Sequence, residues 1–378
     1  MNERERFIRT LTCSSPDRPS YGDYLYYEAT QKRWEKEGLP KDLNREELFN
    51  YFGMDHIDIW DGQKFPVNNG IIPYFESSVV EETDVYTVTK DRCGVTVKVL
   101  KNVPPPAMPQ FISYPVTDRN TWAEYKKRLN PETPGRLPGN LLEIGASSAT
   151  RTTPLCAWFG GTYGYIRDWM GVENASYLFY DDPGLVEEMI EHLTYFYETL
   201  AKKIFDAGVQ VDAVMFWEDM AYKTGSLISP EKYRKYCLRF YKVMVDLVRK
   251  NGVKVIMLDS DGNIEELIPI WLDAGINCMH PMEVAAGMDV RTVRGKYGKN
   301  VTFLGGIDKR ALVRGPAAID AEVIPKVREL LDAGGGFVVE CDHAVPPDIS
   351  LDNYLYFRKL VSKICESSAP NKYPAFSI

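Results

Sequence analysis

From about residue 200 onward, short apolar runs alternate with longer amphipathic segments. The runs are "AVMFW" from 213, "KVIML" from 254, "INCM" from 276, "VTFL" from 301 and "FVV" from 337. Runs of this kind are typical of buried strands, and the segments between them are long enough to form helices. Because a strand that returns in parallel needs a long crossover, the pattern predicts consecutive strand–helix units in a parallel sheet.

Helix boundary signals agree with this pattern. Ser229-Pro230 and Asp182-Pro183 each place an N-cap residue before a proline at the first helical position. Gly252 and Gly334 follow the expected ends of two helices. The amphipathic segments are therefore expected to be helices that cover the sheet.

Two architectures contain such units, a doubly wound open sheet and a (β/α)8 barrel. No GxGxxG or GxxxxGK[ST] motif follows any expected strand, which removes support from a nucleotide-binding open sheet. The barrel is therefore preferred, as a single domain over 1–378 with an N-terminal extension. Its earlier strands must come from the first 200 residues, and "PSYGDYLY" near 19 and "PLCAWFGG" near 154 are candidates.

The segment 70–115 follows a different pattern. Apolar and polar residues alternate through "YFESSVVEETDVYTVTKDRCGVTVKVLKN", and "KDRCG" has the composition of a turn. Alternation with period two predicts strands with one face exposed. We expect an antiparallel β-meander inserted into the barrel domain.

Composition narrows the function. The chain has 378 residues, 44% of them apolar, and a net charge of −8, which argues against a nucleic-acid partner. No apolar run approaches the ~20 residues of a membrane span, and the N-terminus lacks the apolar core of a signal peptide. The seven cysteines show no CxxC spacing. We expect a reduced, cytoplasmic protein.

Candidate chemistry collects just after the expected strands, where the sites of (β/α)8 barrels lie. The residues there are Glu218, Asp219, Asp259, Asp261, His280, Glu283, Asp308, Glu340, Cys341, Asp342 and His343. Asp259 and Asp261 share an orientation if strand geometry continues through both. Carboxylates gathered in one place repel one another, so such a cluster requires protonation or a bound cation.

Structural roles compete with this interpretation. Asp259 or Asp261 would cap a helix that starts near Ile264, and His280 would serve in packing or in a loop hydrogen bond. Cys341 would be a small buried residue. Aromatic residues near these strand ends are individually more typical of a core than of a substrate wall.

Longer motifs resemble a known family. They are "ERERFIRTL…SPDRP", "EATQKRWEKEGLP", "LFNYFGMD", "GTYGYIRDWMG", "DSDGN", "GGIDKRAL" and "CDHAVPPDIS", which extend over nearly the whole chain. The chain resembles the uroporphyrinogen decarboxylase superfamily, and within it the corrinoid-linked methyltransferase branch. The resemblance implies a (β/α)8 barrel.

Two departures from the family motifs bear on activity. True decarboxylases of the family carry an arginine-rich "RQAGRY"-type segment that holds substrate carboxylates, and "DYLYYEATQKRW" lacks it. The methyltransferases bind zinc through His-x-Cys-Gly-Asn and a later cysteine. Here that frame reads Asp259-Ser260-Asp261-Gly262-Asn263, with Cys341 near the place of the later cysteine. The resemblance thus implies an oxygen-richer site that polarises an ether or phenolic oxygen.

The leading hypothesis is a methyltransferase that moves a methyl group from a small, methoxylated aromatic substrate to the cobalt of a separate corrinoid protein. The expected cofactors are zinc and the corrinoid (cobalamin) carried by this partner, and a homodimer is a further possibility. Expected zinc ligands are Asp259, Asp261, Cys341, His343 and His280. Asp259, Asp261 and Glu218 are the expected acid–base groups, and Trp158, Tyr163, Trp217 and Tyr222 the expected substrate wall.

Three alternatives remain. A lyase that decarboxylates an acidic substrate would need arginines at the strand ends, for which Arg151 and Arg167 are candidates. A non-catalytic module would bind a tetrapyrrole or corrinoid without turnover. If the site is metal-free, the carboxylates would act as acid and base, with at least one pKa raised by its neighbours.

Overall fold

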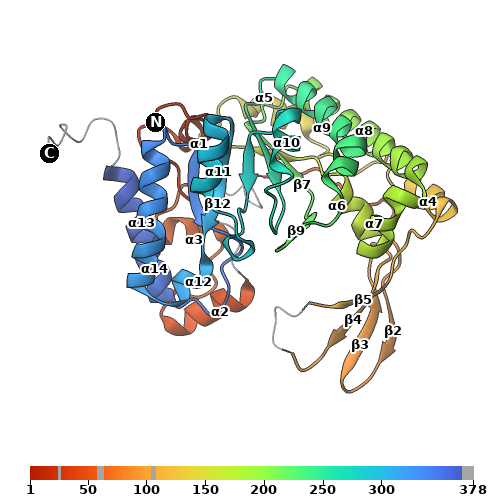
Figure 1. The fold of residues 1–378 in the computed structure, drawn as a ribbon, viewed down its shortest axis with the longest axis horizontal. Coiled ribbons are helices and arrows are strands. Elements are labelled where there is room, and N and C mark those ends of the chain that lie inside the picture. The colour runs from red at the N-terminus through yellow and green to blue at the C-terminus, as the bar shows by residue number, and fades with distance from the viewer. Residues whose placement is uncertain (24–26, 58–63, 104–107, 368–378) are drawn as a thin grey trace.

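The computed structural model describes residues 1–23, 27–57, 64–103 and 108–367. Its main sheet is parallel and has the spatial order β1-β6-β7-β10-β11-β12-β13 (Figure 1). These strands are β1 (Lys64–Phe65), β6 (Cys156–Trp158), β7 (Ala213–Trp217), β10 (Val255–Asp259), β11 (Cys278–His280), β12 (Thr302–Ile307) and β13 (Phe337–Cys341). The five apolar runs after residue 200 and the run near 154 therefore form strands, as predicted.

An eighth segment lies at the edge of this sheet. Tyr21 forms an isolated parallel bridge with Val339 of β13, within the "PSYGDYLY" segment. The neighbouring Asp23 accepts hydrogen bonds from the Cys341 amide at 3.2 Å and from the Tyr354 hydroxyl at 2.8 Å. The described residues show no pairing between this segment and β1, which would close the sheet into a barrel, and residues 24–26 and 58–63 lie outside them.

Helices cover one face of the sheet and form an arc around the strands in Figure 1. They include α6 (Tyr163–Met170), α7 (Val172–Asp181), α8 (Pro183–Asp206), α9 (Pro230–Lys250), α10 (Ile268–Ala274), α11 (Val290–Tyr297), α12 (Lys309–Val313), α13 (Pro316–Asp332) and α14 (Leu351–Ser367). Asp182 and Ser229 cap α8 and α9 through their side chains, as predicted. The helix expected near Ile264 begins instead at Ile268, and no side chain caps it.

The remaining helices precede or flank the sheet. They are α1 (Glu3–Leu11), α2 (Glu28–Glu37) and α3 (Arg45–Tyr51) in the N-terminal extension, and α4 (Arg119–Lys126) and α5 (Leu141–Ser148) before β6. None of the described helices combines the length and the apolar composition that crossing a bilayer requires.

Alternate strand residues belong to two separate cores. The smaller core contains Cys156, Ala213, Met215, Val255, Met257, Cys278, Leu304 and Val338, with Phe7 and Leu11 of α1. Their sequence neighbours, such as Val214, Ile256 and Val339, pack with the helices in the larger core. Because strand side chains alternate between faces, we call the face of the smaller core the inner face and the helix-covered face the outer face.

The segment 70–115 forms a second, antiparallel sheet, as predicted. Its strands are β2 (Ser78–Glu82), β3 (Tyr86–Lys90), β4 (Thr96–Leu100) and β5 (Gln110–Ser113), in that spatial order. Figure 1 shows this meander projecting from the body of the molecule below α6 and α7.

Candidate active site

Acidic and imidazole groups meet where β7, β10 and β11 end. Asp259 is in register with Trp217 on one side and with His280 on the other. Met215 and Met257 are on the inner face, so Trp217 and Asp259, two residues later, also face inward. We call Asp219, Asp259, Asp261, His280 and His343 the strand-end site. The structure thus brings together four residues that the sequence proposed separately, with Asp219 as a fifth.

Asp259 and His280 form a neutral pair. The Asp259 Oδ1 lies 2.9 Å from the His280 Nδ1, and both side chains are buried. Burial and the charges of Asp219 and Asp261 raise the pKa of Asp259 well above its ordinary value. Burial lowers the pKa of His280 to about 3. Both shifts favour the uncharged forms, so the contact is a hydrogen bond between a carboxyl and an imidazole instead of an ion pair.

Asp261 and His343 are charged instead. The His343 Nε2 lies 3.5 Å from the Asp261 Oδ2. Burial disfavours the ionised form of Asp261, but His343, His280 and Lys309 outweigh it and lower the pKa of this carboxyl. Burial also disfavours the imidazolium of His343, yet its hydrogen bond and attraction to Asp261 raise its pKa. The two groups therefore form an ion pair.

Asp219 lies beside Asp261, and the pKa of its carboxyl is shifted differently from those of Asp259 and Asp261. Its Oδ1 accepts a hydrogen bond of 3.2 Å from the Asp261 amide, and its backbone has a φ of 45°. Burial and the charge of Asp261 raise the pKa of Asp219 to about 6. Because its side chain remains 30% exposed, Asp219 can exchange protons near neutral pH while Asp261 stays ionised.

Arg167 of α6 holds one side of this site. Its guanidinium donates to the backbone carbonyl of Asp219 and lies 3.9 Å from the Asp219 Oδ2. It also pairs with Asp168 at 3.1 Å and lies 5.2 Å above the Trp217 ring centre. These contacts partly neutralise the carboxylates and fix the Trp217 ring, which forms an aromatic wall.

Glu218, an expected acid–base group, lies on the outer face. This buried carboxylate accepts hydrogen bonds from the Thr162 amide at 3.0 Å, the Gly164 amide at 2.8 Å and the Tyr233 hydroxyl at 2.9 Å. The Tyr241 hydroxyl is a further donor. Burial raises the pKa of Glu218 in spite of these donors. The structure therefore places Glu218 between β7, α6 and α9, where its hydrogen bonds join these elements, apart from the strand-end site.

Cys341, an expected zinc ligand, also lies on the outer face. It packs in the larger core beside Val339, and burial raises the pKa of its thiol well above the ordinary value. Among the described residues, no group of three or more His, Cys, Asp or Glu side chains is arranged to hold a metal ion. The residues of the strand-end site do not fit the zinc centre that the resemblance implied.

The expected substrate wall is divided. Trp217 lines the strand-end site, and Trp158 packs against the core of the inner face. Tyr163 is fully buried, with its hydroxyl 3.3 Å from the Ser176 hydroxyl. Tyr222 is 62% exposed on a hairpin of β8 (Ala221–Tyr222) and β9 (Gly225–Ser226). Only the two tryptophans therefore lie on the inner face.

The uroporphyrinogen decarboxylase (URO-D) family model matches residues 67–364. This chain is a member of the URO-D family. Curated uroporphyrinogen decarboxylases from Ectopseudomonas mendocina and Azotobacter vinelandii are each 25% identical to it over 177 residues, which is 46% of this chain and 46% of theirs. The aligned part thus spans about half the length of these relatives.

A solved structure shares the fold of this URO-D family member. The methyltransferase from Methanosarcina mazei superposes with a TM-score of 0.59 at 15% identity. The match covers 96% of this chain and 99% of that one. It includes residues that precede the segment matched by the family model, so the N-terminal extension is part of the shared fold.

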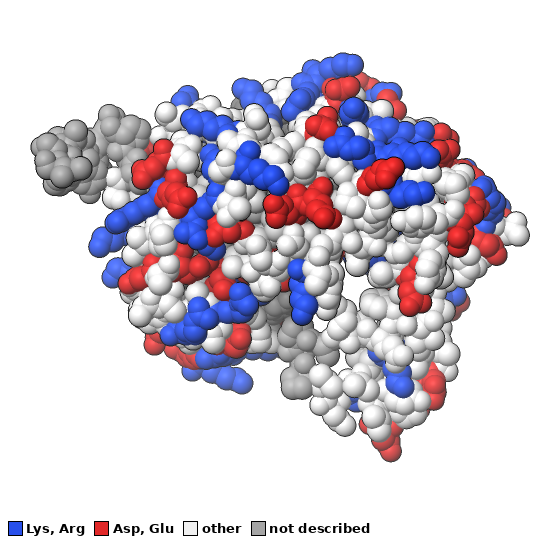
Figure 2. Space-filling view, in the orientation of Figure 1, with Lys and Arg blue, Asp and Glu red and all other residues white. Residues whose placement is uncertain are grey.

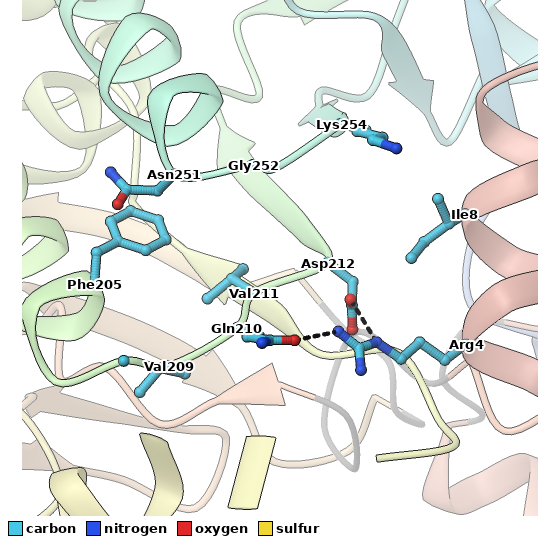
Figure 3. Close-up of a pocket in the computed structure, with 11 residues that line it drawn as sticks. Arg4, Ile8, Phe205, Val209, Gln210, Val211, Asp212, Asn251, Gly252 and Lys254 are labelled. Carbon is cyan, nitrogen blue, oxygen red and sulfur yellow. Dashed lines mark hydrogen bonds and ion pairs between the residues drawn. The ribbon is translucent and has the colours of Figure 1, made fainter. Parts of the chain in front are cut away.

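Decarboxylation by a URO-D family member would need arginines at the strand ends, and Arg151 is not there. It lies at the opposite, amino end of β7, 3.0 Å from the Asp212 carboxylate. A cavity of about 460 Å³ opens at this end (Figure 3). There Arg4 binds Asp212 at 2.8 Å and Gln210 at 3.1 Å. Arg4 and Arg151 therefore share the Asp212 carboxylate at this end.

Other strand-end residues have structural partners in this URO-D family chain. Glu283 accepts a 2.8 Å hydrogen bond from the Gly262 amide, which holds the loop after β10. Asp308 caps α12 and binds Arg310 at 2.9 Å. Asp342 binds Lys309 at 3.1 Å. These contacts position the loops around the strand-end site.

Sequence reasoning placed Asp219 at a strand end but did not select it as a site residue. Strand alternation contains part of the missing signal, because Met215 and Trp217 face inward and Glu218, one residue later, does not. Asp219 follows the end of β7 and has a φ of 45°, so alternation does not fix its direction. The contribution of Lys309 and Tyr27 around His343 has no comparable sequence signal, because both come from segments distant in the chain.

Proposed function

We propose that this URO-D family member is a methyltransferase that transfers a methyl group from a small methoxylated aromatic compound to the cobalt of a corrinoid protein. One observation carries the proposal: a neutral acid pair, an ionised acid pair and a carboxyl with a pKa near neutrality lie together at one strand end. Groups with such separated pKa values are suited to acid–base chemistry. The fold shared with a methyltransferase is consistent with this reaction.

The chemistry requires a proton donor. As the O–CH3 bond breaks, the methyl group passes to the nucleophilic cobalt of the corrinoid, and the aromatic oxygen retains the electron pair as a phenolate. A phenol has a pKa of about 10, so protonating this oxygen makes it a better leaving group. We assign the donation to Asp219, because its carboxyl is partly exposed and its pKa is raised to about 6.

The other groups set the charge and the position of the substrate. Because the Asp259–His280 pair is neutral, it adds no second negative charge beside Asp261. Such a charge would repel the developing phenolate. The Trp217 ring, fixed by Arg167, provides a face for an aromatic ring. No step passes through zinc, since the strand-end site does not fit that ion. We also infer that the sheet closes into a (β/α)8 barrel within one domain.

A decarboxylase of polycarboxylated substrates is disfavoured by charge. Around the strand-end site, the cations Arg167 and Lys309 are each engaged with protein carboxylates. A substrate with several carboxylates would therefore meet Asp219 and Asp261 without matching arginines. The same argument disfavours a module that only binds a polycarboxylated tetrapyrrole.

The test is methyl transfer from a panel of methoxyarenes to cob(I)alamin, followed by absorbance. We expect at least one donor to react, with a rate that falls as pH rises through about 6 because Asp219 loses its proton. Asp219→Asn should lower kcat about 10²-fold or more. Asp308→Asn is the matched control, a strand-end aspartate outside the site, and should keep the wild-type rate.

Two results would overturn the proposal. One is the absence of transfer from every donor at enzyme concentrations comparable to that of cobalamin. The other is release of CO2 from uroporphyrinogen at a rate that Asp219→Asn abolishes.

A further inference from the structure

The cavity of about 460 Å³ at the amino end of the main sheet lies apart from the strand-end site. We call it the amino-end cavity. Its walls come from α1, from the end of α8 and the loop after it, and from the loop between α9 and β10 (Figure 3). Asp212 precedes β7 and Lys254 precedes β10, whereas the strand-end site lies where these strands end. The cavity therefore has no part in the proposed methyl transfer.

Cations outnumber anions at the amino-end cavity. Arg4 and Arg151 share the single carboxylate of Asp212, at 2.8 and 3.0 Å. Lys254 is a further cation in the wall, and within the described part of the chain its ammonium forms no ion pair or hydrogen bond. Over the face of the molecule drawn in Figure 2, by contrast, acidic and basic side chains are interspersed. Three cations beside one carboxylate leave the cavity with an excess of positive charge.

Helix ends reduce this excess without cancelling it. α8 ends at Asp206 and α9 at Lys250, and residues directly after both helices line the cavity. The carbonyl end of a helix carries a partial charge of roughly −0.5, so two such ends offset about one of the positive charges. Arg249 and Lys250 in the last turn of α9 further oppose the partial charge of that helix. The cavity therefore stays positive and attracts anions.

The two arginines are too buried for water to compensate their charges fully. The side chains of Arg4 and Arg151 are 18% and 20% exposed, and the Asp212 side chain between them is 3% exposed. Burial lowers the pKa of Arg151, Asp212 opposes this shift, and the charge of Arg4 adds to it. Because a guanidinium keeps its proton at neutral pH, the arginines repel each other across their shared acceptor. A second anion beside Arg4 would relieve this repulsion.

Another wall of the amino-end cavity is apolar. In Figure 3 the side chains of Phe205, Val209 and Val211 lie on one side of the cavity, and those of Arg4 and Lys254 lie on the other. An inorganic anion would neutralise the cations and leave the apolar side chains in contact with water. A ligand with both an anionic group and an apolar body would match both walls.

We propose that the amino-end cavity binds a small organic acid. Its carboxylate lies between Arg4 and Lys254, and its apolar body packs against Phe205 and Val211. The Arg4 guanidinium uses three of its N–H groups in hydrogen bonds within the protein and keeps others for a carboxylate. The Lys254 ammonium, on a flexible stem, supplies a second charged donor. The ligand thereby provides the anion that the cavity lacks.

Titration calorimetry of the full chain with 2-naphthoate as the probe tests the proposal. We expect saturable binding at one site, and Lys254→Met should weaken it at least about tenfold, because the variant removes a charged donor. Lys242→Met is the matched control, an exposed lysine on α9 outside the cavity, and should keep the wild-type affinity. Acetate lacks the rings and naphthalene-2-methanol lacks the charge, so each should bind at least about tenfold more weakly than 2-naphthoate.

Several results would overturn this assignment. One is the absence of saturable 2-naphthoate binding to the wild type, and another is equal affinity of the wild type and Lys254→Met. Equal weakening by Lys254→Met and Lys242→Met would indicate attraction to the overall charge instead of the cavity. Binding that only Trp217→Leu abolishes would place the acid at the strand-end site. Inorganic phosphate that binds more tightly than 2-naphthoate would exclude a role for the apolar wall. None of these measurements requires methyl transfer, so the two proposals fail separately.

Discussion

The three aspartates of the strand-end site differ in the charge state that their surroundings favour. Burial favours the protonated form of Asp259 beside His280, His343 favours the ionised form of Asp261, and the pKa of Asp219 is raised to about 6. The differences follow from their surroundings, because burial raises a carboxyl pKa and a nearby imidazolium lowers it. Residue identity alone predicted a cluster of acids. The division of proton states depends on which histidine each acid meets in the folded chain.

Asp219→Asn should stabilise the protein above about pH 4, with the full gain above about pH 6. The folded-state pKa of Asp219 is raised above its unfolded value, so the wild type loses stability as pH rises between these two values, from about 4 to about 6. Asparagine removes this ionisation and tolerates the φ of 45°. We expect a gain on the order of 1–2 kcal/mol at pH 8 and none at pH 4, measured by urea unfolding. An equal gain at both pH values would refute the raised pKa.

Asp259→Asn removes the acidic proton of this side chain and keeps its shape. Because the raised pKa favours the neutral carboxyl, the amide should preserve packing beside His280 and change stability by less than about 1 kcal/mol. If the acidic proton of Asp259 supports the reaction, kcat falls about 10²-fold or more. Thermal unfolding and methyl-transfer rates measure the two effects. A loss of more than about 3 kcal/mol would instead indicate that Asp259 is ionised in the native state.

At the scale of elements, β7 serves both faces of the sheet. Trp217 and Asp219 face the strand-end site, and Glu218 between them is fixed on the outer face by α6 and α9. Gly164 also lies close to this strand, since a Cβ built on it would clash with the Glu218 carbonyl oxygen. The outward carboxylate therefore positions the two inward residues.

Removing the hydrogen bonds of Glu218 should destabilise the fold. Glu218→Ala leaves buried donors from Thr162, Gly164 and Tyr233 without an acceptor. We expect a loss of about 3–5 kcal/mol in the free energy of unfolding, measured by guanidinium titration. Tyr241→Phe removes one donor and keeps the acceptor, so it should cost only about 1 kcal/mol. Equal costs for the two variants would contradict the role assigned to Glu218.

Strand positions were predictable from the sequence, and side-chain directions were predictable only in part. Apolar runs located β7, β10, β11, β12 and β13, because buried parallel strands lack polar residues on both faces. β1 has two residues, Lys64–Phe65, and no run marks it. Because Val338 faces inward, the alternation of side chains along β13 would have placed Cys341 on the outer face. The approach of His343 to Asp261 required the loops, whose geometry no periodicity encodes.

At the scale of the whole molecule, the strand-end site departs from the zinc frame that the resemblance to the methyltransferase branch implied. Asp259 and Asp261 occupy the His-x-Cys frame, and Cys341 faces the helices. The residues that remain form two hydrogen-bonded acid–imidazole pairs instead of one converging ligand set.

Elemental analysis should therefore find much less than one zinc per chain in protein purified without chelator. Carboxylate and imidazole groups that bind each other do not converge on an ion, so added zinc should bind weakly and dialyse away. Asp261→Cys together with Asp259→His restores the family frame and should raise zinc affinity. Tightly bound stoichiometric zinc in the wild type would refute the metal-free site.

The edge between Tyr21 and β13 has a consequence for biosynthesis. Asp23 is held there by Arg358 at 3.6 Å and by Tyr354, both on α14, and by the Cys341 amide. A ribosome makes the partners of Asp23 more than 300 residues after Asp23 itself. Until these partners emerge, the nascent chain has an unpaired strand edge. Asp23, which is buried in the folded protein, is then exposed to water. We expect this chain to depend on chaperone binding during translation until α14 has emerged from the ribosome.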